Sequence, residues 1–191
     1  MKKFFLVAAI TAVGFASKAQ VTFGVKAGLN ISSWTGDDAD GASSLAGFNA
    51  GGQVNIPVSS QFSVQPEVTY SGEGVKFDGG KYTTNYINIP VLFQYNNPSG
   101  FFAHVGPQIG ILASAKAKID GAGSTDAKDA FKSTNFSAVI GAGYKLANGL
   151  GFNARYNLGL ANIIDADGVS VKTSVFQVGA FFSFGGAKSK D

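Results

Sequence analysis

Residues 176–184 have the sequence FQVGAFFSF, and this stretch decides the fold. Starting at Phe176, every second residue is apolar up to Phe184, and Gln177, Gly179 and Ser183 lie among the residues between them. A period of two is the pattern of a β-strand that turns one face toward an apolar environment. The stretch therefore predicts a strand with one apolar face near the end of the chain.

The same alternation recurs in seven earlier segments, with turn-forming residues between them. These segments are residues 21–31, 48–56, 62–70, 87–95, 101–112, 135–146 and 150–160. Each is near the length of about ten residues that a tilted strand needs to cross a bilayer. The sequence therefore predicts an all-β fold, an eight-stranded antiparallel up-and-down transmembrane β-barrel.

Three prolines interrupt the alternating segments. Pro66, Pro90 and Pro107 each remove one backbone donor from a strand. Because proline is found in sheets mainly at edges, strand ends and bulges, we expect bulges or strand ends at these positions.

The connections between the predicted strands alternate between long and short. The long ones are residues 32–44, 72–84, 113–134 and 162–172, and the short ones are 57–60, 96–100 and 146–149. Outer-membrane barrels alternate long external loops with short periplasmic turns in this way. Both chain ends are then expected on the periplasmic side.

The N-terminal segment predicts export. Lys2 and Lys3 precede a short apolar stretch, and Ser17-Lys18-Ala19 has the small-x-small form of a cleavage site. We expect a signal peptide over residues 1–19 with cleavage after Ala19. A barrel domain over 20–184 and a short tail over 185–191 would follow.

Composition limits the function classes. Only 14% of the 191 residues are charged, whereas 45% are hydrophobic and none is cysteine. Removing Lys2, Lys3 and Lys18 from the 15 basic residues leaves 12, equal to the 12 acidic ones. A neutral mature chain argues against nucleic acid as a partner, and the lack of cysteine excludes disulfides and thiolate metal sites.

The alternation alone does not say whether the apolar face meets lipid or a core. The opposite face is rich in Gly, Ser, Asn, Gln and Thr, which suit a crowded, hydrogen-bonded barrel interior. Aromatic residues such as Phe62, Tyr70, Tyr144 and Tyr156 recur toward strand ends, as in interfacial girdles. Both features indicate that the apolar face contacts outer-membrane lipid. The alternative is a soluble, lipocalin-like carrier of a hydrophobic ligand, whose apolar face would point inward.

The last predicted strand resembles the C-terminal assembly signal of bacterial outer-membrane proteins. The residues that carry this resemblance are Gln177, Gly179, Phe182 and Phe184, although the strand stops seven residues before the chain end. The resemblance implies the barrel-assembly machinery as a partner.

The mature chain also resembles the PorT-type family of outer-membrane β-barrel proteins of Bacteroidetes. The matching pieces are FGVKAGLN at 23–30, YINIPVL at 86–92, GPQIG at 106–110, GAGY at 141–144 and RYNLGL at 155–160. The resemblance implies a barrel in the cell outer membrane of a Gram-negative bacterium. It implies no activity, because such proteins share a fold and not a function.

Five polar residues are predicted to form a network in the barrel lumen. They are Lys26, Glu67, His104, Lys145 and Arg155, which all lie on the inward face of the alternation. Charges in a narrow lumen are costly unless they are paired, so we expect Glu67 to meet at least one basic group.

No candidate catalytic, cofactor or metal site emerges. His104 is the only histidine and no nucleophile motif accompanies it, so a lumen hydrogen bond explains it better than catalysis. Asp37, Asp38 and Asp40 lack the ligand order of a calcium loop. The glycines Gly141 and Gly143 fit a crowded lumen better than a nucleotide site.

The favoured function is that of a monomeric structural or interaction protein that displays external loops. Residues 32–44 and 113–134 are the candidate contacts for an external partner, and residues 115–132 have the composition of a short helix. An eight-stranded barrel encloses little more than its own side chains, so we expect a plugged lumen. A narrow pore for small solutes or ions is the alternative, and a membrane enzyme is the third hypothesis.

Overall fold

The computed structural model describes residues 20–37, 39, 41–166 and 168–185. The predicted signal peptide lies outside the described residues, and so does all of the predicted tail except Gly185.

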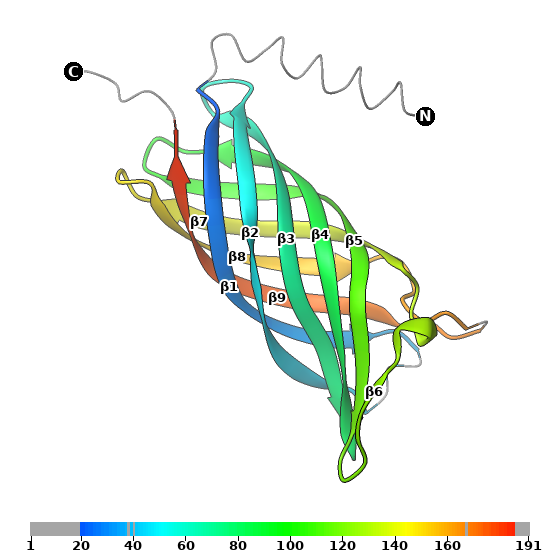
Figure 1. Ribbon diagram of the computed structural model, residues 1–191. Helices are drawn as coiled ribbons and strands as arrows, with labels where there is room; N and C mark the ends of the chain where they lie inside the picture. The colour runs from blue at the N-terminus through cyan, green and yellow to red at the C-terminus, as the bar shows by residue number, and fades with distance from the viewer. Residues whose placement is uncertain (1–19, 38, 40, 167, 186–191) are drawn as a thin grey trace.

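Eight long antiparallel strands form a closed barrel (Figure 1). Each strand pairs with its neighbours in sequence, the last strand pairs with the first, and β4 pairs with β5. A short additional strand, β6, extends the edge of β5 beyond the barrel. The predicted up-and-down barrel is confirmed. The barrel strands are β1 (Thr22–Thr35), β2 (Ser43–Pro57), β3 (Phe62–Phe77), β4 (Gly80–Asn96), β5 (Phe101–Ile119), β7 (Thr134–Lys145), β8 (Leu150–Gly159) and β9 (Lys172–Phe184), and β6 covers Gly123–Asp126.

The two faces of the sheet have the polarity of a barrel that meets lipid. On β1, Val25 and Leu29 point outward and are 56% and 63% exposed, whereas Lys26 and Asn30, the residues that directly follow them, are buried. The other strands repeat this pattern, with large apolar side chains outside and amides, hydroxyls and charges inside. A lipocalin-like carrier would have the apolar face inside, so the structure contradicts that alternative.

The strands are longer than the sequence pattern predicts, and two predicted long loops are largely strand. Residues 72–84 form the paired ends of β3 and β4 around a two-residue turn at Asp78 and Gly79. Residues 113–134 begin as β5, turn back as β6 and continue through the short 3-10 helix η1 (Lys128–Ala130). Strand pairing therefore continues beyond the apolar band. The short helix expected in this segment is present.

The three prolines cause no register shift. β3 and β4 pair in one register from Pro66 opposite Val91 to Thr69 opposite Asn88, and Pro107 lies opposite Ala138 in an unbroken register. The expectation of bulges or strand ends at Pro66, Pro90 and Pro107 was wrong, because a single lost donor leaves the flanking pairs in place. The irregularities lie instead between Ser44 and Asn49 and beside Asn85.

The two ends of the barrel differ. The start of β1 and the end of β9 lie at one end, here called the terminal end (Figure 1). The opposite end, here called the loop end, carries β6, η1 and residues 36–42 and 160–171, apart from the undescribed positions. Within the described residues, no helix is long and apolar enough to cross a membrane.

Candidate functional site

The centre of the barrel interior is occupied by one carboxylate, that of Glu67 on β3. Lys26 Nζ donates to Glu67 Oε2 at 2.8 Å, and Arg155 donates from both terminal nitrogens to the two carboxylate oxygens, at 2.9 and 3.1 Å. Gln65 Nε2 adds a fourth donor at 2.9 Å. The side chain of Glu67 is fully buried, and the side chains of Lys26 and Arg155 are almost fully buried. The expectation that Glu67 meets at least one basic group is confirmed, since two basic side chains contact it.

The Glu67–Arg155 ion pair crosses the barrel along its diameter. In the ring of eight barrel strands, β3 and β8 are separated by four steps in either direction, so Glu67 and Arg155 project from opposite walls. Two-point pairing between a guanidinium and a carboxylate fixes both side chains in one geometry. The lumen is therefore bridged from wall to wall at this level.

Amides form a second layer, centred on Asn30 of β1. Asn30 Nδ2 donates to Ser71 Oγ at 2.9 Å, and Asn30 Oδ1 accepts from Gln177 at 2.9 Å. Ser71 Oγ then donates to Glu73, which also accepts from Asn88 at 3.2 Å. This chain of bonds joins β9, β1, β3 and β4, so the layer ties half of the barrel wall together from inside.

His104 is buried near the Glu67–Arg155 ion pair but forms no hydrogen bond with it. Neither ring nitrogen has a hydrogen-bond partner among the described residues, and the ring lies 5.7 Å from that of Phe102. A Cβ at Gly141 would come within 2.6 Å of His104 Nε2. The imidazole therefore occupies the space that a side chain at position 141 would need. This agrees with the interpretation that Gly141 and Gly143 suit a crowded lumen.

Phe102 and Phe181 close the interior toward the terminal end. Their rings meet edge to face with centroids 5.7 Å apart. Each is opposite a glycine, because a Cβ at Gly143 would lie 2.4 Å from Phe102 and one at Gly151 would lie 2.2 Å from Phe181. Each large ring thus occupies the space that a side chain on the neighbouring strand would need.

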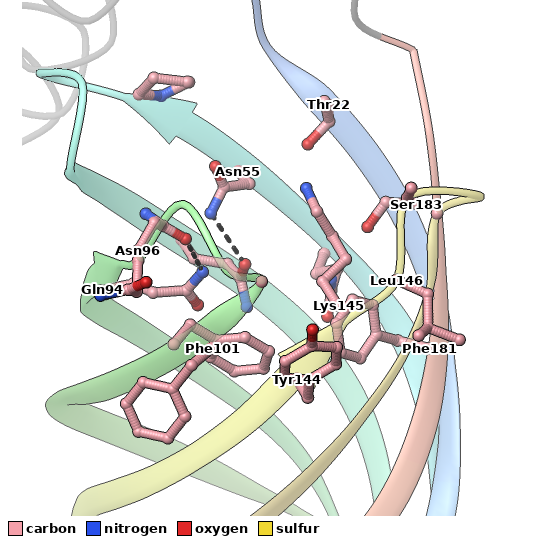
Figure 2. A pocket seen from close by; sticks show the side chains of 18 of the residues that line it. Thr22, Asn55, Gln94, Asn96, Phe101, Tyr144, Lys145, Leu146, Phe181 and Ser183 are labelled. Atoms are coloured by element: carbon pink, nitrogen blue, oxygen red, sulfur yellow. Dashed lines mark hydrogen bonds between the residues drawn. The ribbon is translucent and has the colours of Figure 1, made fainter.

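Beyond these two rings the terminal end opens into a cavity of about 910 Å³, here called the vestibule (Figure 2). Amide side chains such as Asn55, Gln94 and Asn96 line it together with Lys145. Lys145 is exposed there, at the last residue of β7, and it makes no ion pair with any residue that the structure describes. The structure therefore brings Lys26, Glu67 and Arg155 together but leaves Lys145 out, because a strand end lies outside the enclosed lumen.

The loop end is closed by an apolar cluster, here called the cap, that the sequence analysis did not predict. The rings of Trp34, Tyr82 and Phe131 lie 5.4 to 5.9 Å from one another. Phe131 follows η1, and Ile163 comes from the segment between β8 and β9, so two connections fold inward over the lumen. Backbone bonds fix them, including Lys132 N to Ile163 O at 2.8 Å. The available signal was the presence of Trp34, Phe131 and Ile163 in otherwise polar segments.

The remaining sequence-predicted residues occupy separate places. Gln177 and Gly179 point inward on β9, whereas Phe182 and Phe184 are exposed on the outer face. Asp37 is exposed in the connection after β1, and Asp38 and Asp40 lie outside the described residues. In the part of the chain that the structure describes, no three His, Asp or Glu side chains gather as metal ligands.

Two bacterial proteins are among the solved structures that share this fold. The crystal structure of neisserial surface protein A superposes with a TM-score of 0.59 at 14% identity, covering 85% of this chain and 97% of that one. The attachment invasion locus protein Ail of Yersinia pestis gives 0.52 at 16% identity, covering 86% and 99%. At these identities the likeness shows the fold alone.

No curated protein matches the sequence at a significant level. A family described as outer membrane protein beta-barrel domain matches residues 15–165, which is most of the chain. Together with the outward apolar face, this match places the barrel in the outer membrane, and the chain belongs to the outer membrane protein beta-barrel domain family.

Proposed function

We propose that this protein is a non-conducting outer-membrane barrel with a structural or interaction role, which holds its loop end outside the cell. The observation that carries the proposal is the Glu67–Arg155 ion pair across the diameter of the lumen. Removing one partner of a buried ion pair leaves an uncompensated charge, so this bridge does not open without a large cost.

Two further layers support the occluded lumen. The Phe102–Phe181 pair closes the section next to the vestibule, and the cap closes the loop end. Leu92 and Val139, which are both fully buried, fill space between these layers. An ion moving along the axis would have to displace an aromatic pair, an ion pair and the cap in turn.

An enzymatic role gains no support from the interior. Acid–base catalysis by His104 would require a nucleophile or a carboxylate within hydrogen-bond distance of the ring. Both ring nitrogens lack such a partner among the described residues. We therefore propose no catalytic residue.

Single-channel recording in planar bilayers tests the proposal. The full mature chain should give a silent membrane, and an established porin added to the same membrane should open, which verifies that this membrane reports conducting channels. A narrow pore, the alternative function, predicts stable openings whose conductance changes in Glu67→Gln. Such openings in the unmodified protein would overturn the plugged-barrel proposal.

A further inference from the structure

Three lysines face one another across adjacent strands near the tip of the loop end. Lys76 of β3 is the register partner of Lys81 of β4, and Lys81 is also the partner of Lys118 of β5. Register partners in an antiparallel sheet project from the same face, about 5 Å apart. These residues therefore form a continuous row, here called the lysine row.

The lysine row points away from the barrel axis. Two residues further along β4, Thr83 lies on the same face as Lys81, and Tyr82 between them turns inward to the cap. Since successive residues alternate between faces, Lys81 lies on the same outer face as Ile87 and the other lipid-facing residues. Lys76 and Lys118 are exposed, and Lys81 is half-buried.

None of the three lysines has an ion-pair partner within the described residues. The nearest acidic residues along the chain, Asp78 and Asp120, lie in the turns beyond the row and do not pair with it. Like charges directly opposite each other destabilise a sheet. Three in succession repel one another, and an anion bound along them would relieve this repulsion.

We propose that the lysine row binds the phosphate groups of the saccharide part of lipopolysaccharide, the anionic glycolipid that surrounds an outer-membrane barrel. Lysine binds phosphate as a point charge, and a row of three spaced by the strand separation fits several phosphates along one glycan. The outward direction selects a ligand that stands beside the barrel rather than one that approaches along its axis.

The height of the row agrees with this ligand. Lys76 lies six residues beyond Tyr70, the last large apolar residue on the outer face of β3, which is about 20 Å along the strand. With the usual strand tilt of about 40°, the row stands about 15 Å above the apolar band. That level belongs to phosphorylated sugars and not to acyl chains.

This inference rests on the proposed function only in placing the loop end outside the cell. The plugged lumen is independent of it, because the row lies on the outer face. Loss of saccharide binding from a silent barrel would therefore remove the inference and leave the proposed function intact.

The test uses the folded full-length mature protein and a soluble probe, deacylated lipopolysaccharide that keeps its phosphates. Isothermal titration calorimetry compares the unmodified protein with Lys76→Gln/Lys81→Gln/Lys118→Gln. A matched control, Lys128→Gln/Lys132→Gln/Lys172→Gln, loses the same charge at the same end of the barrel. The same probe after removal of its phosphates, inorganic phosphate alone and heparin form the other arms.

We expect the row variant to bind the probe at least tenfold more weakly, and the control variant to bind within twofold of the unmodified protein. The probe without phosphates should bind at least tenfold more weakly to the unmodified protein, and inorganic phosphate alone should bind more weakly still. Equal binding by the row variant, an equal loss in the control or undiminished binding of the phosphate-free probe would each overturn the proposal. Tighter binding of heparin would overturn it in favour of a sulfated glycan.

A single substitution supplies a second readout. Without ligand, Lys81→Gln should raise the thermal unfolding midpoint because it removes the central charge of the row. With ligand, it should lose most of the stabilisation that the probe gives the unmodified protein. A lowered midpoint without ligand would contradict the repulsion on which the proposal depends.

Discussion

At the scale of single residues, Glu67 organises the interior. Its carboxylate accepts from Lys26, Arg155 and Gln65, which project from β1, β8 and β3. A buried ion pair is weak evidence for stability by itself, but removal of one partner leaves buried charges uncompensated. In Glu67→Ala, Lys26 and Arg155 would face each other without an anion.

We expect Glu67→Ala to lower the free energy of unfolding by about 3–5 kcal/mol, as measured by urea titration of the folded protein in detergent micelles. Lys145→Ala is the matched control, because Lys145 is an exposed charge on another strand and has no ion-pair partner in the described part of the chain. Its effect should stay within about 0.5 kcal/mol. Similar losses in both variants would show that the buried bridge has no special role.

The lumen glycines also act residue by residue. Gly141, Gly143 and Gly151 each lie beside a large inward ring, and a Cβ at any of them would come within 2.6 Å of that ring. The sequence showed small residues on the inward face, but it did not show which ring each glycine accommodates. That pairing depends on register across strands distant in sequence.

At the scale of elements, the cap determines how the connections at the loop end are held. Phe131 packs against Trp34 and Tyr82, and the residues beside it bond to the segment that contains Ile163. Truncation of a buried phenylalanine costs about 3–5 kcal/mol when the cavity does not collapse. Such a loss removes the main apolar contact of this connection with the cap.

We therefore expect Phe131→Ala to release η1 and its flanks while the barrel stays folded. Limited trypsin digestion should cut after Lys128 and Lys132 at least tenfold faster in Phe131→Ala than in the unmodified protein. Asp129→Ala, which changes an exposed residue of the same helix, should leave the cleavage rate nearly unchanged. Unchanged cleavage in Phe131→Ala would mean that the cap does not hold this connection.

The strands could be predicted from sequence because each one alternates over its whole membrane-spanning length. The facing of residues 101–112 and 150–159 agrees with the alternation at every position with a large side chain. The extension of β3 and β4 to the turn at Asp78 and Gly79 could not be predicted. There the inward side becomes apolar through Val75 and Tyr82, so the contrast between the two faces is lost.

The candidate site was predictable only in part, for a similar reason. Alternation places Lys26, Glu67 and Arg155 on the inward face, but only strand order shows that β3 and β8 are opposite each other. Lys145 follows the same alternation yet lies at the open mouth, because the position along the barrel axis decides whether an inward residue is enclosed. The cap depends on contacts between two separate connections and the strands that carry Trp34 and Tyr82, and no local pattern records them.

At the scale of the whole molecule, polarity is inverted relative to a soluble barrel. Large apolar side chains such as Leu29 and Ile140 are more than 60% exposed, whereas Glu67, Asn30 and Arg155 are almost completely buried. Closure leaves no free strand edge in the barrel wall, so the backbone polar groups within lipid are satisfied between strands. The outer face has the polarity of a surface that contacts lipid, and the inner face has that of a hydrogen-bonded plug.

The most direct test of this arrangement is single-cysteine labelling along β7 in lipid vesicles, because the chain has no native cysteine. Ser137→Cys and Val139→Cys place small thiols on the inner face, and Ala138→Cys places one between them on the outer face. We predict that only Ala138→Cys reacts with a lipid-soluble maleimide and that none of the three reacts with a membrane-impermeant thiosulfonate. Reaction of Ser137→Cys and Val139→Cys with the impermeant reagent would reveal an open aqueous lumen and contradict the plugged barrel.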